Sequence, residues 1–156
     1  MSKFDEAMKL LDEKLGNKDN LISLSTIALE PGADGKSRPA ARIVDAYYED
    51  GAFYTVTYAA TDKMRQIAAN PEVAVCIIVE SFTADGIGEN LGWVCDEKNA
   101  EMAAKLRQVF AAWDNEANND EDPNTCLLRI RLTKGLWNNA HEGIRNEIDF
   151  ISRTAD

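Results

Sequence analysis

The sequence of 156 residues is 45% hydrophobic and 28% charged, which is enough for one well-buried domain and too short for two comfortable ones. Its formal net charge of -10 argues against broad binding to nucleic acid or to anionic membranes, because both need an extended basic surface. No apolar run is long enough to span a membrane and the N-terminus lacks the apolar stretch of a signal peptide, so we expect one domain, residues 1–156, in the cytoplasm.

The first part of the chain predicts a helix followed by antiparallel strands. Apolar residues at helical spacing from Phe4 to Leu15 indicate an amphipathic helix that stops at Gly16. Residues 21–29 are typical of a strand, and turn residues at 31–35 and 49–51 delimit the next two.

The second strand, residues 39–45, sets a single arginine in an apolar extended run. Alternation places Arg42 and Val44 on the same face. A guanidinium there is costly to desolvate unless it meets an anion, and its planar fork suits a phosphate. The anion could be a ligand phosphate or a carboxylate of the protein.

The third strand, residues 53–57, leads through a hydroxyl-rich turn into a short helix that ends at Asn70-Pro71. A helix N-terminus carries unsatisfied N–H groups and a partial positive charge, to which Thr57, Thr61 and Lys63 add two hydroxyls and an ammonium. We interpret this turn as a phosphate cradle. The alternative is an ordinary N-cap by Thr61 beside a solvated Lys63.

The remaining chain adds strands at residues 73–79, 91–95, 126–132 and 147–151, and a helix at 102–113 whose apolar stripe is typical of core packing. Gly86 and Gly88 are interpreted as a flexible connection. The fold class is therefore mainly β (α+β), a small antiparallel barrel of about six strands with two or three helices.

Metal and acid–base chemistry find little support. The acidic residues 114–122 lack the glycine and glutamate of a calcium loop, so we expect a solvated loop. His141 is the only histidine, which excludes a histidine-based metal cage, and a surface role is expected for it. Cys76, Cys95 and Cys126 are predicted to be reduced core residues, because they are odd in number and lie far apart in apolar runs.

In order and spacing, the arginine strand and the strand–turn–helix segment resemble the pyridoxamine 5'-phosphate oxidase-like, FMN-binding split-barrel family. The resemblance implies that Arg42, Thr61 and Lys63 hold the phosphate of FMN, with Thr57 close to it. It further implies that the main chain of Arg42-Ile43-Val44 and Thr55-Val56 lines the isoalloxazine ring.

The same resemblance implies a homodimer with the flavin between two subunits. Trp137 is a candidate for a cross-subunit flavin contact. Tyr47 and Tyr48 point to opposite faces of a strand, so that one of them could be covered by the partner.

The function that the resemblance implies is an FMN-dependent oxidoreductase in which the flavin performs hydride or electron transfer, so that no side chain need act as an acid or base. The family's C-terminal substrate signature is not reproduced around Trp137, and the shorter chain resembles the small general-stress-protein branch. The alternative is a flavin- or haem-binding carrier or sensor, in which haem would need His141 as its axial ligand.

Overall fold

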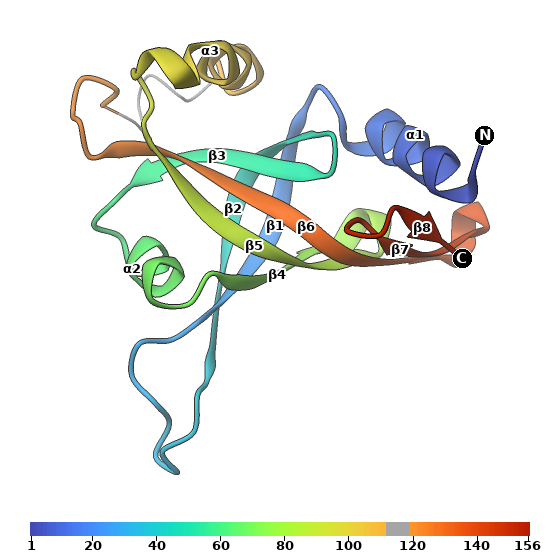
Figure 1. The fold of residues 1–156 in the computed structure, drawn as a ribbon, viewed down its shortest axis with the longest axis horizontal. Coiled ribbons are helices and arrows are strands. Elements are labelled where there is room, and N and C mark those ends of the chain that lie inside the picture. The colour runs from blue at the N-terminus through green and yellow to red at the C-terminus, as the bar shows by residue number, and fades with distance from the viewer. Residues whose placement is uncertain (112–118) are drawn as a thin grey trace.

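The structure is a computed structural model that describes residues 1–111 and 119–156 (Figure 1). The helices are α1 (Lys3–Leu15), α2 (Asp62–Ala69) and α3 (Ala100–Val109), with the 3-10 turns η1 (Ile78–Glu80), η2 (Glu97–Asn99) and η3 (Ala140–Glu142). The strands are β1 (Asp19–Ile27), β2 (Pro39–Glu49), β3 (Ala52–Tyr58), β4 (Glu72–Ile77), β5 (Phe82–Trp93), β6 (Thr125–Asn139), β7 (Ile144–Asp149) and β8 (Thr154–Ala155). None of the helices in these described ranges is long and apolar enough to cross a bilayer.

The sheet closes into an antiparallel barrel of six strands. Strands follow the order β3-β2-β1-β4-β5-β6-β7-β8, and a further pairing of β3 with β6 closes the ring from β1 to β6. Strands β7 and β8 extend the sheet beyond β6. The predicted fold class is thereby confirmed.

The ring opens where β2 and β3 separate. These strands pair over only three residue pairs, from Tyr47↔Tyr54 to Glu49↔Ala52. Beyond them β2 follows β1 as far as Pro39↔Ile27, while β3 follows β6 as far as Tyr58↔Thr125. The two strands therefore diverge, and the barrel is split between residues 39–46 and 55–58.

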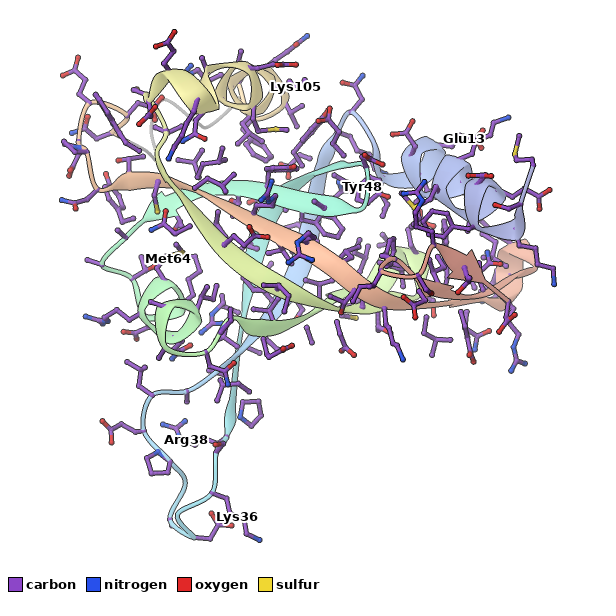
Figure 2. All side chains as sticks on the ribbon, in the orientation of Figure 1. Glu13, Lys36, Arg38, Tyr48, Met64 and Lys105 are labelled. Atoms are coloured by element: carbon purple, nitrogen blue, oxygen red, sulfur yellow. The ribbon has the colours of Figure 1, made fainter. Side chains whose placement is uncertain are left out.

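Each helix covers a different part of the barrel (Figure 1). Helix α1 begins with a capping box at Ser2, lies against β2, β7 and β8, and buries Phe4, Leu11 and other apolar residues of one face. Helix α2 packs against β1 and β5 at the other end and buries Met64, labelled in Figure 2, and Ile67. Helix α3 covers the outer face of β3.

Gly86 and Gly88 lie inside the continuous strand β5, so the prediction of a flexible connection is wrong. A Cβ on Gly88 would lie 2.9 Å from a methyl group of Ile67, and one on Gly86 would lie 2.9 Å from the carbonyl oxygen of Arg131. The glycines therefore allow α2 and β6 to approach β5 closely, which is a packing requirement rather than a turn signal.

Three further predictions need correction. Tyr47 and Tyr48 are both buried within their own chain, Tyr47 in the cluster beneath α3 and Tyr48 in the main core, so neither awaits a partner. The predicted strand 73–79 ends at Ile77, and Val79 is 84% exposed in η1. Helix α3 ends at Val109, and Trp113 and most of the acidic residues 114–122 lie outside the described residues.

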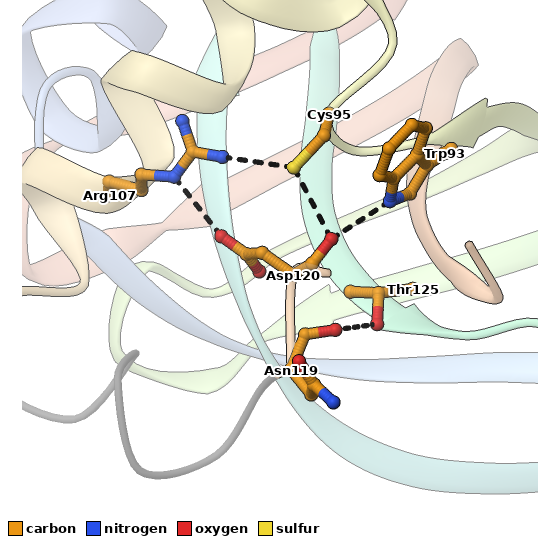
Figure 3. A network of polar contacts seen from close by, with 6 residues as sticks. All are labelled: Trp93, Cys95, Arg107, Asn119, Asp120 and Thr125. Atoms are coloured by element: carbon orange, nitrogen blue, oxygen red, sulfur yellow. Dashed lines mark hydrogen bonds and ion pairs between the residues drawn. The ribbon is translucent and has the colours of Figure 1, made fainter. Parts of the chain in front are cut away.

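The cysteines also differ in environment. Cys126 is buried as predicted, Cys76 is half-buried, and Cys95 is exposed, so the prediction that it is a core residue is wrong. Figure 3 shows why Cys95 stays outside. Its thiol donates to the carbonyl oxygen of Asp120 (3.3 Å), which also accepts from Trp93 Nε1 (2.8 Å), while Arg107 forms an ion pair with the Asp120 carboxylate (3.1 Å).

One segment projects from the body of the protein. Residues 28–38 join β1 to β2 as a long arm (Figure 1), and Lys36 and Arg38 lie along it (Figure 2). Both side chains are exposed. The arm leaves the barrel at the end where α2 packs.

Candidate functional site

Arg42 lies on β2 at the split in the barrel. Alternation along the strand half-buries Arg42 and Val44 on one face and leaves Ile43 63% exposed on the other, as the sequence predicts. The main chain of residues 42–44 thus borders the split on one side, and that of Thr55 and Val56 borders it on the other.

Neutral oxygen atoms surround the Arg42 guanidinium. Nη1 donates to Thr26 Oγ1 (2.6 Å) and Nη2 donates to Gln66 Oε1 (2.9 Å). Arg42 forms no ion pair within residues 1–111 and 119–156. The charge of Asp62 raises the pKa of Arg42 by less than burial lowers it, and the Asp62 carboxylate itself is paired with Arg65. Burial lowers the pKa of Arg42 from its usual value. Within the described residues, no carboxylate forms an ion pair with this cation.

Lys63, in the first turn of α2, is a second cation without a counter-ion. It is half-buried and has no ion pair within the described chain. Burial lowers the pKa of Lys63, and the nearby charge of Arg42 lowers it further, whereas the charge of Cys126 acts in the opposite direction. Two cations that disfavour each other's charge are held together at the split.

The turn before α2 leaves its amides available. Thr61 occupies the N-cap position, but its hydroxyl donates to the carbonyl oxygen of Tyr58 (2.9 Å) and makes no cap hydrogen bond. Thr61 is therefore at the N-cap without capping through its side chain, and Lys63 is half-buried rather than fully solvated. Thr57 is buried and its hydroxyl has no protein partner in the described part of the chain.

These groups form one candidate oxyanion site from three elements. Arg42 comes from β2, Thr57 comes from β3, and Lys63 comes from the start of α2, where Thr61 is the N-cap residue. A guanidinium fork, an ammonium and helix N–H groups together suit a dianionic phosphate. Arg42 and Lys63 lie close enough for their charges to interact, and Thr57 is the cross-strand neighbour of Cys126, whose charge also acts on Lys63.

Trp137 is not at this place. Its side chain is 0% exposed, stacks edge-on against Phe82 (centroids 5.8 Å apart) and donates from Nε1 to the carbonyl oxygen of Glu80 (2.9 Å). A contact with a cofactor would require exposed surface, so the side chain of Trp137 has none to offer. We leave it out of the site.

His141 lies in η3, exposed as expected. The following residue, Glu142, forms an ion pair with Lys14 of α1, which places His141 at the end of the barrel opposite α2 (Figure 1). Within one chain it cannot reach the split.

Sequence reasoning missed the residues that hold Arg42. Thr26 and Gln66 are buried polar residues on β1 and α2. The only sequence signal was a polar residue at a position where the pattern calls for an apolar one, and that signal does not identify its partner.

Comparison with known proteins gives a family and a fold. The family model described as pyridoxamine 5'-phosphate oxidase matches residues 12–136. A search of curated protein sequences finds no match.

Three solved structures share the fold at low sequence identity. General stress protein 26 of Bacillus anthracis str. Sterne is 19% identical, with 83% of this chain and 92% of that chain covered and a TM-score of 0.59. An FAD-binding protein of Mesorhizobium loti is 16% identical, with 81% and 90% covered and a TM-score of 0.55. The haem storage protein HutZ of Vibrio cholerae is 13% identical, with 88% and 95% covered and a TM-score of 0.61.

The unpaired Lys63 makes a prediction about pH. Its folded pKa lies below the ordinary 10.5, so in the interval between the two values the unfolded chain binds more protons and the folded state gains stability as pH rises. Urea unfolding of the parent and of Lys63→Met at pH 8 and pH 10 measures this. We expect the unfolding free energy of the parent to rise relative to that of the variant, and the exposed Lys9→Met to behave as the parent. Equal pH dependence in all three proteins would contradict the lowered pKa.

Proposed function

Since the chain belongs to the pyridoxamine 5'-phosphate oxidase family, we propose that it is an FMN-binding oxidoreductase whose substrate is unassigned. One observation carries the proposal: two half-buried cations, Arg42 and Lys63, share the split between β2 and β3 without a counter-ion from the described chain. The net charge of the chain is -10, yet none of the carboxylates in the described ranges forms an ion pair with Arg42 or Lys63. Such a pair is costly to maintain unless it binds an anion.

The residues present fit FMN. Arg42 and Lys63 would bind its phosphate, together with the hydroxyl of Thr57 and the first amides of α2. Thr61 would contribute through the helix start, because its hydroxyl proton is already donated to Tyr58. The main chains of Arg42-Ile43-Val44 and Thr55-Val56, on the two sides of the split, would flank the ring.

The chemistry would rest on the cofactor. Bound FMN supplies hydride or electron transfer through its ring. The protein would orient that ring by the phosphate and by the two strands, and would exclude water from its buried side. Cys126 is the buried thiol nearest to Lys63, and burial raises its pKa, so it stays protonated and needs no role as a base.

A haem or flavin carrier on the same fold is the competing function. Haem binding in this chain would need an axial ligand, and His141, the single histidine of the sequence, lies at the end of the barrel opposite the split. We therefore favour flavin. The visible spectrum of the purified protein separates the two, because flavin and haem absorb differently.

The phosphate site makes a quantitative prediction. Arg42→Ala and Lys63→Ala should each weaken FMN binding by about 10- to 100-fold, since each removes a charge-assisted contact of ~1.5–3 kcal/mol. Riboflavin, which lacks the phosphate, should bind the parent less tightly than FMN and should be little affected by either variant. Titration of the apoprotein by flavin fluorescence measures both ligands.

The controls are cations of the same kind in exposed positions, Arg38→Ala on the arm and Lys9→Ala on α1. Equal affinity of the parent for FMN and riboflavin, or an unaffected Arg42/Lys63 double variant, would contradict the phosphate site.

We propose a homodimer as well, with flavin contacts from both chains. The outer face of β2, β1, β4, β5 and β6 carries one row of cross-strand neighbours, Ile43, Ser23, Cys76, Thr83 and Leu136. No described helix covers this row, and Cys76, Thr83 and Leu136 are among the residues that line a hollow of about 600 Å³ on it.

Exposed apolar side chains support this face as the interface. Leu21, Ile43 and Leu136 are 65%, 63% and 46% exposed on it, and Ile78 at the end of β4 is 80% exposed. Several large apolar side chains exposed on one face are typical of an interaction site. Ile43 and Arg42 are neighbours on opposite faces of β2, so a partner that covers Ile43 would lie next to the cofactor.

The dimer prediction is tested at Leu136. Leu136→Glu should raise the dissociation constant of the dimer by at least about tenfold, because a buried unpaired carboxylate opposes association. FMN should lower the concentration at which the parent dissociates, since ligand and association are linked. Analytical ultracentrifugation with and without FMN measures both, and Gln108→Glu on the exposed side of α3 is the charge-matched control. A parent that stays monomeric and binds FMN at full affinity rules out the shared site.

A further inference from the structure

The Arg42 guanidinium is held by a closed triangle of side chains. Nη1 donates to Thr26 Oγ1 (2.6 Å), Nη2 donates to Gln66 Oε1 (2.9 Å), and the Thr26 hydroxyl donates to the same Gln66 oxygen (2.5 Å). Thr26 is 1% exposed and Gln66 is 9% exposed. Both partners are therefore fixed by the core, Thr26 through β1 and Gln66 through α2.

The triangle occupies one particular edge of the guanidinium. Its two acceptor oxygens are 2.5 Å apart, which fits the two N–H groups that point outward between Nη1 and Nη2. The other Nη1 hydrogen faces the carbonyl oxygens of Leu24 (3.3 Å) and Ala40 (3.4 Å). This leaves Nε–H and the second Nη2–H, which lie side by side on the adjacent edge and have no acceptor in the described chain. That edge is a fork that matches two oxygens of one phosphate.

We infer that Thr26 and Gln66 are positioning residues for the anion site, an inference that rests on the proposed function. They hold the guanidinium of Arg42 by the edge between Nη1 and Nη2. The adjacent edge, formed by Nε–H and the second Nη2–H, then faces the phosphate. Gln66 also ties β2 to α2, which fixes the distance between the Arg42 fork and the helix start that carries Lys63. Without the triangle, the long arginine side chain would be free to adopt other rotamers and would lose that entropy on binding.

Thr26 and Gln66 are both neutral, and their neutrality matters for the binding of an anion. A carboxylate at position 66 would hold the guanidinium at least as firmly, but it would cancel the charge that attracts the phosphate. In this acidic chain a glutamine and a threonine hold Arg42 in place and leave its charge available.

Two variants at position 66 separate positioning from charge. Gln66→Met removes the acceptor and keeps the size, and Gln66→Glu keeps the acceptor and adds a charge. The measured quantity is the ratio of riboflavin to FMN dissociation constants of the apoprotein, because a general loss of packing weakens both ligands and leaves the ratio unchanged. Thr26→Val, close in shape, provides a second route if Gln66→Met folds poorly, and Gln108→Glu on α3 is the control for the added charge.

We expect Gln66→Met and Thr26→Val to lower that ratio by about 3- to 10-fold, because they weaken one phosphate contact without deleting it, and Gln66→Glu to lower it by about 10- to 100-fold. The thermal midpoint of the Gln66→Glu apoprotein should not fall, since Arg42 gains an ion pair. A parent that prefers FMN, with a ratio that Gln66→Met and Thr26→Val leave unchanged, overturns the positioning role alone. A parent without that preference overturns the proposed function and this inference together.

Discussion

The early end of β2–β3 pairing is the constraint on which the site depends. Strand β2 is hydrogen-bonded to β1 along nine residue pairs and to β3 along three, so the two strands that meet at the 49–52 turn separate before they reach α2. A closed barrel would have its backbone groups satisfied there by the ladder. The divergence instead leaves two main-chain segments facing the same opening, and it gives Arg42 and Lys63 room to approach each other from different elements. Closure by β3–β6 keeps the core intact while the split is open.

Helix α2 links the split to the core. Its apolar face, including Met64 and Ile67, packs on the barrel, and Gly88 lacks a side chain where Ile67 would meet it. On the same helix Gln66 grips Arg42, and Lys63 lies one turn earlier. The packing of α2 on the barrel therefore fixes the position of Lys63 relative to Arg42. Helix α2 thereby connects the close contact at Gly88 on β5 to the position of Arg42 on β2.

The sequence predicted those site residues whose charge is unexpected among their immediate neighbours in the chain. Arg42 was identifiable because a guanidinium in an apolar strand requires an anion, and Lys63 because it follows a hydroxyl-rich turn at a helix start. Gln66 and Thr26 were not, because their role exists only when α2 and β1 meet. Gly86 and Gly88 were misinterpreted because glycine has the same letter whether it permits a turn or a close approach. Trp137 was placed at a subunit contact by resemblance, and the ring in fact fills the core beside Phe82.

The negative net charge of the chain restricts where an anion can bind. A net charge of -10 lowers the local concentration of any anion near most of the surface. An anion can then bind only where positive charge is concentrated and shielded from carboxylates by the fold. The neutral shell of Thr26, Gln66 and main-chain carbonyls around Arg42 meets that condition, because it supplies hydrogen bonds without negative charge. Two cations that form no ion pair within the described residues reduce the stability of the ligand-free protein, and the proposed anion would offset that cost.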